Sequence, residues 1–69
     1  MGTHFTVFKS AANQQWYFNI KGGNHEIMAQ SEGYATMQGA LNTVAVIKRD
    51  AAKAPVYVAQ NGQWVQVAA

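Results

Sequence analysis

The strongest constraint on this chain is that it is short and carries nothing to crosslink it. Its 69 residues include no cysteine, and two histidines, His4 and His25, are too few to form a structural zinc site by themselves. In a chain of this length, the estimated gain from burying apolar surface and the entropic cost of ordering nearly cancel. Association with another chain is the remaining common way to stabilise such a fold, and we therefore expect a partner.

The composition nevertheless predicts a folded protein. Hydrophobic residues make up 49% of the chain and charged residues 12%, which is too apolar and too weakly charged for intrinsic disorder. Surface scaling for this mass predicts about 4,300 Å² of exposed area in a compact fold. No apolar stretch is long enough to span a membrane, and the start of the chain lacks the pattern of a secretory signal. We expect a single domain, residues 1–69, in the cytoplasm.

Three segments of the first half predict an antiparallel meander. Residues 5–8, 16–20 and 26–30 are rich in aromatic and β-branched side chains, and polar or glycine-containing stretches separate them. Residues 21–24 include two glycines and an asparagine, which tolerate the positive φ of a tight turn. Strand alternation in the second segment puts Trp16, Phe18 and Ile20 on a core face, and Tyr17, Asn19 and Lys21 on a wetter face.

The segment after the meander predicts one helix laid against the sheet. Thr36 is a suitable N-cap, and Lys48 and Arg49 complement the carbonyl end of the helix dipole. Pro55 prevents continuation of the helix. Apolar residues recur at spacings of three and four, which predicts a single stripe facing the sheet: Met37, Ala40, Leu41, Val44 and Ile47.

The end of the chain predicts a second hairpin. Asn61-Gly62 is the dipeptide that most readily forms a two-residue turn with positive φ at both positions, and it separates residues 56–60 from 63–67. The expected register pairs Val58 with Val65 and Val56 with Val67 on one face. It pairs Ala59 with Trp64 and Tyr57 with Gln66 on the other.

Parts of the sequence resemble the YegP-like family of small uncharacterised proteins. The segments are Phe5-Thr6-Val7-Phe8-Lys9, Trp16-Tyr17-Phe18-Asn19-Ile20-Lys21 and Asn24-His25-Glu26-Ile27-Met28-Ala29-Gln30-Ser31-Glu32-Gly33-Tyr34, of which Ser31 to Tyr34 is the most specific. The resemblance covers about residues 3–59, the expected core of the domain, and leaves residues 60–69 as a C-terminal strand extension. Met37 and Gln38 stand where charged residues would be more typical of the family.

The resemblance implies a fold and an assembly, and it implies no activity. The fold is α+β, a β-β-β-α-β unit whose antiparallel sheet packs on one helix, here followed by the C-terminal hairpin. Such units occur as tandem repeats in one chain or as homodimers that exchange C-terminal strands. A chain with one unit should then dimerise, and we expect Val56, Tyr57, Val58 and Trp64 to form the dimer contact. Whether residues 60–69 pair within their own chain or with the partner stays open.

The residues carry no readable catalytic, cofactor or metal site. The run from His25 to Ala29 begins like a zinc-protease helix, but Ala29 replaces the second histidine and the segment is predicted to be a strand. The chain has three acids in all, Glu26, Glu32 and Asp50, and no serine or threonine has an evident base to activate it. We expect Glu32 to cap or brace the start of the helix. No enzyme activity and no cofactor are expected.

One alternative function concerns single-stranded nucleic acid. The sequence pI of about 9.2 indicates a basic balance. Phe8, Tyr17 and Lys21 could form a stacking and phosphate-contact surface on the sheet, with Tyr57 or Trp64 as further candidates. The net charge of +2 and the scattered cations argue against strong phosphate binding. We therefore favour the interpretation that the chain is a self-associating structural or interaction module.

Overall fold

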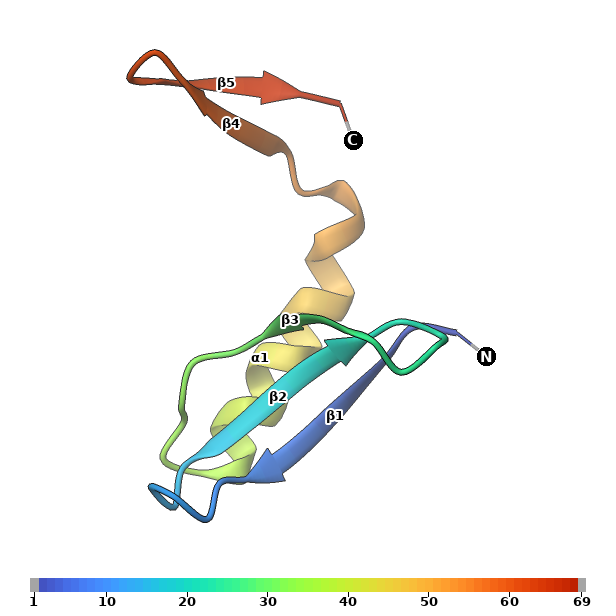
Figure 1. The fold of residues 1–69 in the computed structure, drawn as a ribbon, viewed down its shortest axis with the longest axis vertical. Coiled ribbons are helices and arrows are strands. Elements are labelled where there is room, and N and C mark those ends of the chain that lie inside the picture. The colour runs from blue at the N-terminus through green and yellow to red at the C-terminus, as the bar shows by residue number, and fades with distance from the viewer. Residues whose placement is uncertain (1, 69) are drawn as a thin grey trace.

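A computed structural model describes residues 2–68 of the chain, as a three-stranded sheet, one helix and a separate hairpin (Figure 1). In chain order the elements are β1 (His4–Lys9), β2 (Trp16–Lys21), β3 (Ile27–Gln30), α1 (Met37–Asp50), the short 3-10 helix η1 (Ala51–Lys53), β4 (Val56–Gln60) and β5 (Gln63–Val67). The expected α+β fold, with a meander, one helix and a C-terminal hairpin, is confirmed.

The sheet has the order β1-β2-β3, with both neighbouring pairs antiparallel. Val7 lies opposite Phe18, and Phe8 lies opposite Tyr17, so alternate pairs point to opposite faces of the sheet. The register between β2 and β3 shifts between Ile20 and Lys21, which marks a bulge. The sheet therefore has two free edges, a regular one along β1 and a shorter, irregular one along β3.

The turn between β2 and β3 differs from the sequence prediction. Neither Gly22 nor Gly23 has a positive φ, and the left-handed residue is His25, with a φ of 66°. The turn closes one residue later than expected, because the Gly22 amide donates to the Glu26 carbonyl at 2.9 Å. The Asn24 side-chain oxygen also accepts from the Glu26 amide at 3.1 Å, a local bond that stabilises the longer turn.

The segment between β3 and the helix continues the pairing with β2. The Ser31 amide donates to the Phe18 carbonyl at 2.9 Å, and the Tyr34 amide donates to the Trp16 carbonyl at 2.8 Å. The Tyr34 ring stacks on the ring of Phe18, with centroids 6.2 Å apart. A Cβ on Gly33 would collide with the Gln15 side-chain oxygen, so the chain passes close to β2 here. This part of the chain is thus built into the sheet and is not a free loop.

Helix α1 begins and ends as the sequence predicts. The Thr36 hydroxyl accepts from the Gly39 amide at 3.0 Å, which confirms the N-cap, and Lys48 lies in the last turn. Arg49 donates two hydrogen bonds to the Asp50 carboxylate, each at 3.0 Å, and this contact raises the pKa of Arg49. Both side chains are largely exposed, so this ion pair contributes little to stability.

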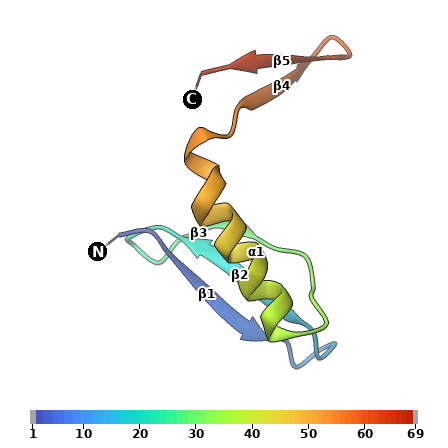
Figure 2. The ribbon, with the colours of Figure 1, turned by 180° about the vertical axis from the view of Figure 1, so that it is seen from behind.

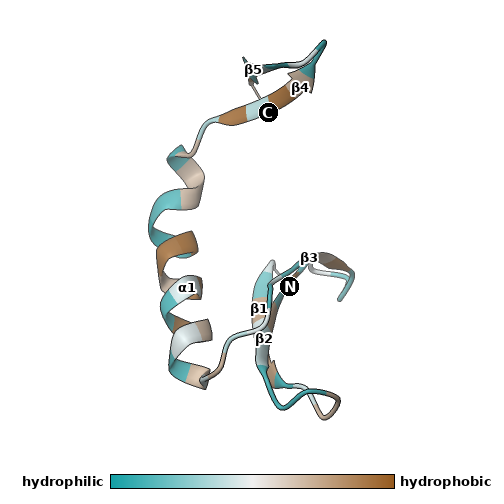
Figure 3. Cartoon of the chain, turned by 90° about the vertical axis from the view of Figure 1, so that its left-hand side faces the viewer, coloured by the Kyte–Doolittle hydropathy of each residue, from teal (hydrophilic) through white to brown (hydrophobic). Residues whose placement is uncertain are grey.

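The helix covers one face of the sheet, and covers it incompletely. It contacts β1 and β2 but not β3, and in Figure 2 it lies in front of the strands. Ala40 and Phe18 are the only buried hydrophobic residues among residues 2–68. Met37 and Leu41 of the predicted core stripe remain 48% and 38% exposed, so the sheet does not cover the whole stripe. Figure 3 shows that the second half of α1 extends past the strands.

The C-terminal hairpin has the predicted register and stands apart from the rest. Val56 pairs with Val67, Val58 with Val65, Ala59 with Trp64 and Tyr57 with Gln66. Asn61 and Gly62 both have positive φ, 51° and 77°, which confirms the predicted turn. Among residues 2–68, β4 and β5 contact each other and no other helix or strand, and Figure 3 shows the hairpin well separated from the sheet.

The whole chain is far more extended than a compact domain of its size. Its accessible area is 5327 Å², where a compact fold of this mass exposes about 4,300 Å². Its radius of gyration is 14.5 Å, where a compact domain of this length has about 11 Å. Both quantities reflect the projecting hairpin and the uncovered half of α1.

Candidate functional site

The projecting hairpin presents two chemically different faces. One face carries four valines, Val56, Val58, Val65 and Val67, and ends in the pair of Gln60 and Gln63 beside the turn; we call the surface formed by the four valines the valine face. The opposite face carries Tyr57, Ala59, Trp64 and Gln66. All four of the sequence-predicted contact residues are exposed, with values of 40% for Val56, 52% for Tyr57, 39% for Val58 and 74% for Trp64.

Such exposure is unusual for a hairpin of this composition. A strand pair with valines on one face and aromatic rings on the other normally buries at least the more apolar face. An isolated hairpin of this length is also only marginally stable in water. The valine face therefore has the character of an incomplete core that needs a second surface.

The main sheet offers apolar surface that fits this need. On its helix side, Phe5 and Val7 of β1 are only half-buried. Leu41 and Val46 of α1 are 38% and 45% exposed. Helix α1 contacts β1 and β2, so β1 is the edge strand that lies beside the helix.

The other face of the sheet, which we call the open face, is not covered by the helix (Figures 1 and 2). Cross-strand pairs on this face form three rows. They are Phe8 with Tyr17, then Thr6 with Asn19 and Gln30, then His4 with Lys21 and Ile27. The sequence-predicted nucleic-acid residues Phe8, Tyr17 and Lys21 therefore do share one face.

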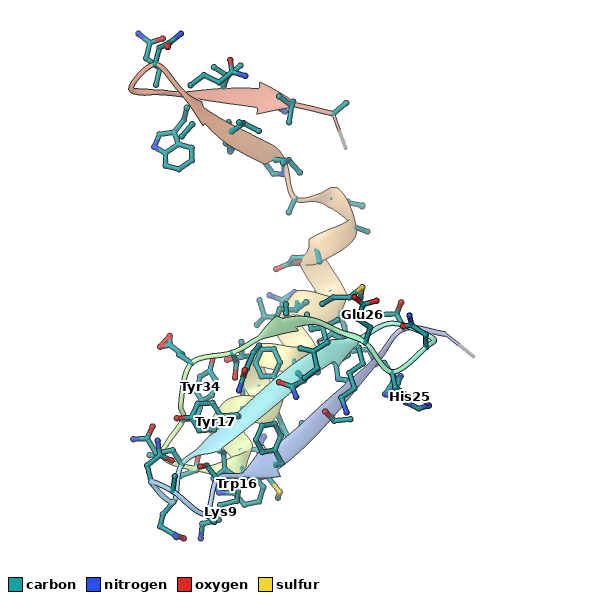
Figure 4. The ribbon with its side chains drawn as sticks, in the orientation of Figure 1. Lys9, Trp16, Tyr17, His25, Glu26 and Tyr34 are labelled. Carbon is teal, nitrogen blue, oxygen red and sulfur yellow. The ribbon has the colours of Figure 1, made fainter. Side chains whose placement is uncertain are left out.

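The aromatic row is an ordered pair of rings. The rings of Phe8 and Tyr17 stack with centroids 6.0 Å apart and planes 21° apart. Asn13 donates to the Tyr17 hydroxyl at 2.7 Å, which fixes the orientation of that ring. Figure 4 shows Tyr17 at one end of the sheet, with His25 and Glu26 at the other end.

Sequence reasoning missed the most unusual residue of the open face. Strand alternation predicts that Asn19 lies on the wetter face, yet it is only 8% exposed, and its Oδ1 has no hydrogen-bond partner. It lies on the central strand, where Thr6 and Gln30 flank it across the sheet and Tyr17 and Lys21 along the strand. The central position of the second predicted strand was the available signal for its burial.

The remaining polar side chains suggest no chemistry. The rings of His4 and His25 meet edge to face at 5.7 Å, but no group of three potential metal ligands occurs within residues 2–68. The same part of the chain has no pocket. Glu32 is exposed and its side chain makes no hydrogen bond among these residues, so the expected bracing of the helix start is not seen. None of the described helices is long and apolar enough to cross a bilayer.

Comparisons with known proteins agree with this description. The family described as "Domain of unknown function (DUF1508)" matches residues 11–57. A UPF0339 protein of Neisseria meningitidis serogroup B is 36% identical over 53 residues, which cover 77% of this chain and 93% of that protein. UPF0339 protein YegP of Escherichia coli is 42% identical over 40 residues, which cover 58% of this chain and only 36% of YegP.

One solved structure is similar over most of the chain. The solution structure of a protein from Haloferax volcanii matches with a TM-score of 0.74 and 36% sequence identity. The match covers 84% of this chain and 97% of that protein. None of these proteins has the name of an enzyme.

Proposed function

The chain belongs to the DUF1508 family, the YegP-like proteins, and from this premise we propose that it is a self-associating interaction module whose hairpin joins the sheet of a second copy. The proposal includes no catalytic activity. A chain without cysteine needs no oxidising compartment, which suits the cytoplasmic location that we propose.

The observation that carries the proposal is the excess of exposed surface. The chain exposes 5327 Å², roughly 1,000 Å² more than a compact fold of its mass. If two copies covered this excess reciprocally, the interface would bury roughly 2,000 Å² in total. That area is at the lower end of the range of about 2,000–5,000 Å² that is typical of obligate homodimers.

The chemistry of the two surfaces supports the same arrangement. The four valines of the valine face form two adjacent cross-strand pairs, which leaves Gln60 and Gln63 as the polar pair next to the turn. If β4 extends the partner's sheet with this face toward the helix, its valines meet the half-buried Phe5 and Val7 and the exposed Leu41. A twofold axis makes the exchange reciprocal, so each chain both donates and receives a hairpin.

The free edge of β1 is the better place for the incoming strand. β1 is six residues long and pairs with β2 without a register shift. β3 is four residues long, its pairing is bulged, and α1 does not contact it. A strand added beside β3 would lie beyond the helix and leave its valines in water, whereas one added beside β1 lies next to the helix.

The arrangement can be tested by isotope-filtered nuclear Overhauser spectroscopy on a mixture of labelled and unlabelled chains. We expect contacts between chains that join the methyl groups of Val58 to Val7 and Leu41. Contacts of Val58 that occur only within one chain, or that join it to β3 of the other chain, would contradict the proposal. A control pair, Phe18 and Tyr34, should give contacts within one chain only, because their rings stack in the body of the fold.

A further inference from the structure

The side-chain amide of Asn19 raises a question that self-association through the β1 edge does not answer. Its Oδ1 is buried and unpaired, and the cost of such an unsatisfied acceptor is about 1–3 kcal/mol. Buried polar groups nearly always have partners, so each exception calls for a cause. Asn19 lies on the open face, opposite Thr6 and Gln30, and an external donor would reach its buried Oδ1 only after the side chains that cover it move aside.

The residues on either side of Asn19 along the strand differ in a way that indicates a ligand. On one side is the aromatic row, the stacked rings of Phe8 and Tyr17. On the other side is Lys21, which makes no ion pair with any residue from 2 to 68. An aromatic platform, an amide and a cation thus follow one another along about 13 Å of strand, since residues four apart are separated by four rises of about 3.3 Å.

The charges around this face favour an anion. None of the eight residues in its three rows is acidic. The nearest acid in sequence, Glu26, lies in the turn beyond Lys21 and accepts from the Asn24 side chain at 3.2 Å. His4, opposite Lys21, and His25, which contacts His4, add two imidazole rings at the same end.

We propose that the open face binds a short single-stranded nucleic acid. Its bases stack on Tyr17 and Phe8, and a phosphate contacts Lys21. A base edge donates to the unpaired Oδ1 of Asn19 once the side chains that cover this atom move aside. Sheets that recognise RNA combine these three elements, with exposed aromatic rings that stack two or three bases. An acidic peptide could contact Lys21. It would bring no planar base to stack on the rings of Phe8 and Tyr17, and no base edge to donate to the amide of Asn19.

The site is present in a single chain, so the proposal does not depend on self-association. If the hairpin joins β1 of the partner with its valine face toward the helix, Tyr57 and Trp64 fall on the side of the open face. The partner's rings would then extend the aromatic row beside Phe8. Failure of self-association would remove this extension and leave the three rows intact.

Binding should be weak and only moderately sensitive to salt. With one or two cations in contact with phosphate, the logarithm of affinity should fall with the logarithm of salt concentration with a slope of about −0.7 to −1.4. The test is fluorescence anisotropy of labelled mixed-sequence single-stranded RNA and DNA with the full chain, at low and at physiological salt. The mass of the protein is measured in the same samples, so that monomer and dimer are distinguished.

Three variants test the three elements. Tyr17→Leu removes a stacking ring, and we expect about tenfold weaker binding. Lys21→Gln should make the salt dependence less steep, by about 0.7 in the slope. Lys53→Gln, an equal charge change in η1, should leave the affinity unchanged.

Asn19→Leu should weaken binding about tenfold. It should also raise the midpoint of unfolding without ligand, because it removes the unpaired acceptor.

The outcomes separate the proposal from its alternatives. Absence of binding at low salt would overturn it, whatever the mass of the protein. Binding that Lys53→Gln weakens as much as Lys21→Gln would show non-specific attraction and would also overturn it. If Asn19→Leu lowers the unfolding midpoint and leaves binding unchanged, Asn19 has a structural role only, and the assigned contact is wrong. Binding by a monomeric protein would support this site and count against self-association.

Discussion

At the scale of single residues, Ser31 shows why the segment most specific to the family has its particular residues. Its hydroxyl accepts from the Phe18 amide at 2.9 Å and donates to the Glu32 carbonyl at 2.8 Å. A backbone carbonyl cannot take the place of this hydroxyl, because the strand β3 has already ended at Gln30. Ser31 therefore continues the pairing with β2 where the regular ladder stops.

We predict that Ser31→Ala destabilises the fold by about 1–2 kcal/mol, because it leaves the part-buried Phe18 amide without an acceptor. The measurement is urea unfolding followed by tryptophan fluorescence. Ser10→Ala is the matched control, since its hydroxyl accepts from the exposed Ala12 amide, which water can satisfy. If the two variants lose the same free energy of unfolding, the hydrogen bond of Ser31 contributes no more to stability than the exposed bond of Ser10.

Gly62 tests the turn of the hairpin. Its φ is 77°, a conformation that costs a residue with a Cβ about 1 kcal/mol, although nothing lies within 4 Å of a Cβ added there. We predict that Gly62→Ala loosens the hairpin and weakens any assembly that depends on it by about that amount. Gly2→Ala, also in open space and without a positive φ, should be neutral in the same thermal unfolding experiment. A neutral Gly62→Ala would mean that the hairpin contributes nothing to stability.

At this scale the sequence predicted patterns well and individual burial poorly. Thr36 as the N-cap and the positive φ of Asn61 and Gly62 follow from local chemistry, and each is confirmed. The burial of Asn19 could not be read from alternation, because it depends on what surrounds the central strand on both sides. The positive φ of His25 was missed for a similar reason, since hydrogen bonds of Gly22 and Asn24 set the length of the turn.

At the scale of elements, the order of strands and helix was predictable, and the packing of α1 was not. The spacing of its apolar residues is typical of a helix with one buried stripe, yet Met37 and Leu41 remain exposed. The spacing of apolar residues predicts which of them share a side of the helix. It does not predict how much of that side the sheet covers. Leu41, an exposed member of this stripe, belongs to the surface that the proposed dimer uses.

A charge on the valine face tests this element directly. We predict that Val58→Asp raises the dissociation constant of the proposed dimer at least about a hundredfold, because an unpaired carboxylate would be buried against Phe5 and Val7. Gln66→Asp adds the same charge to the opposite face of the hairpin and should have a much smaller effect. Sedimentation velocity over a range of concentrations gives both constants. Equal effects of the two variants would show that the valine face does not point into the interface.

At the scale of the whole molecule, the helix and strands are well formed, but much of their apolar surface is exposed. Strands, caps and turns have ordinary geometry, yet no large side chain among residues 2–68 is fully buried, and the hairpin contacts no other strand or helix. A chain of this length without crosslinks gains too little from such burial to be stable alone. A second copy would supply the missing surface to the hairpin and to the exposed half of α1.

The most direct test of self-association is sedimentation equilibrium of the full 69-residue chain at micromolar concentrations. The account predicts a mass of twice 7.5 kDa, which falls toward that of the single chain on dilution or in Val58→Asp. It also requires that the unfolding midpoint of the same samples rises with protein concentration. A well-folded protein whose mass stays at 7.5 kDa throughout, with an unfolding midpoint independent of concentration, would contradict the account.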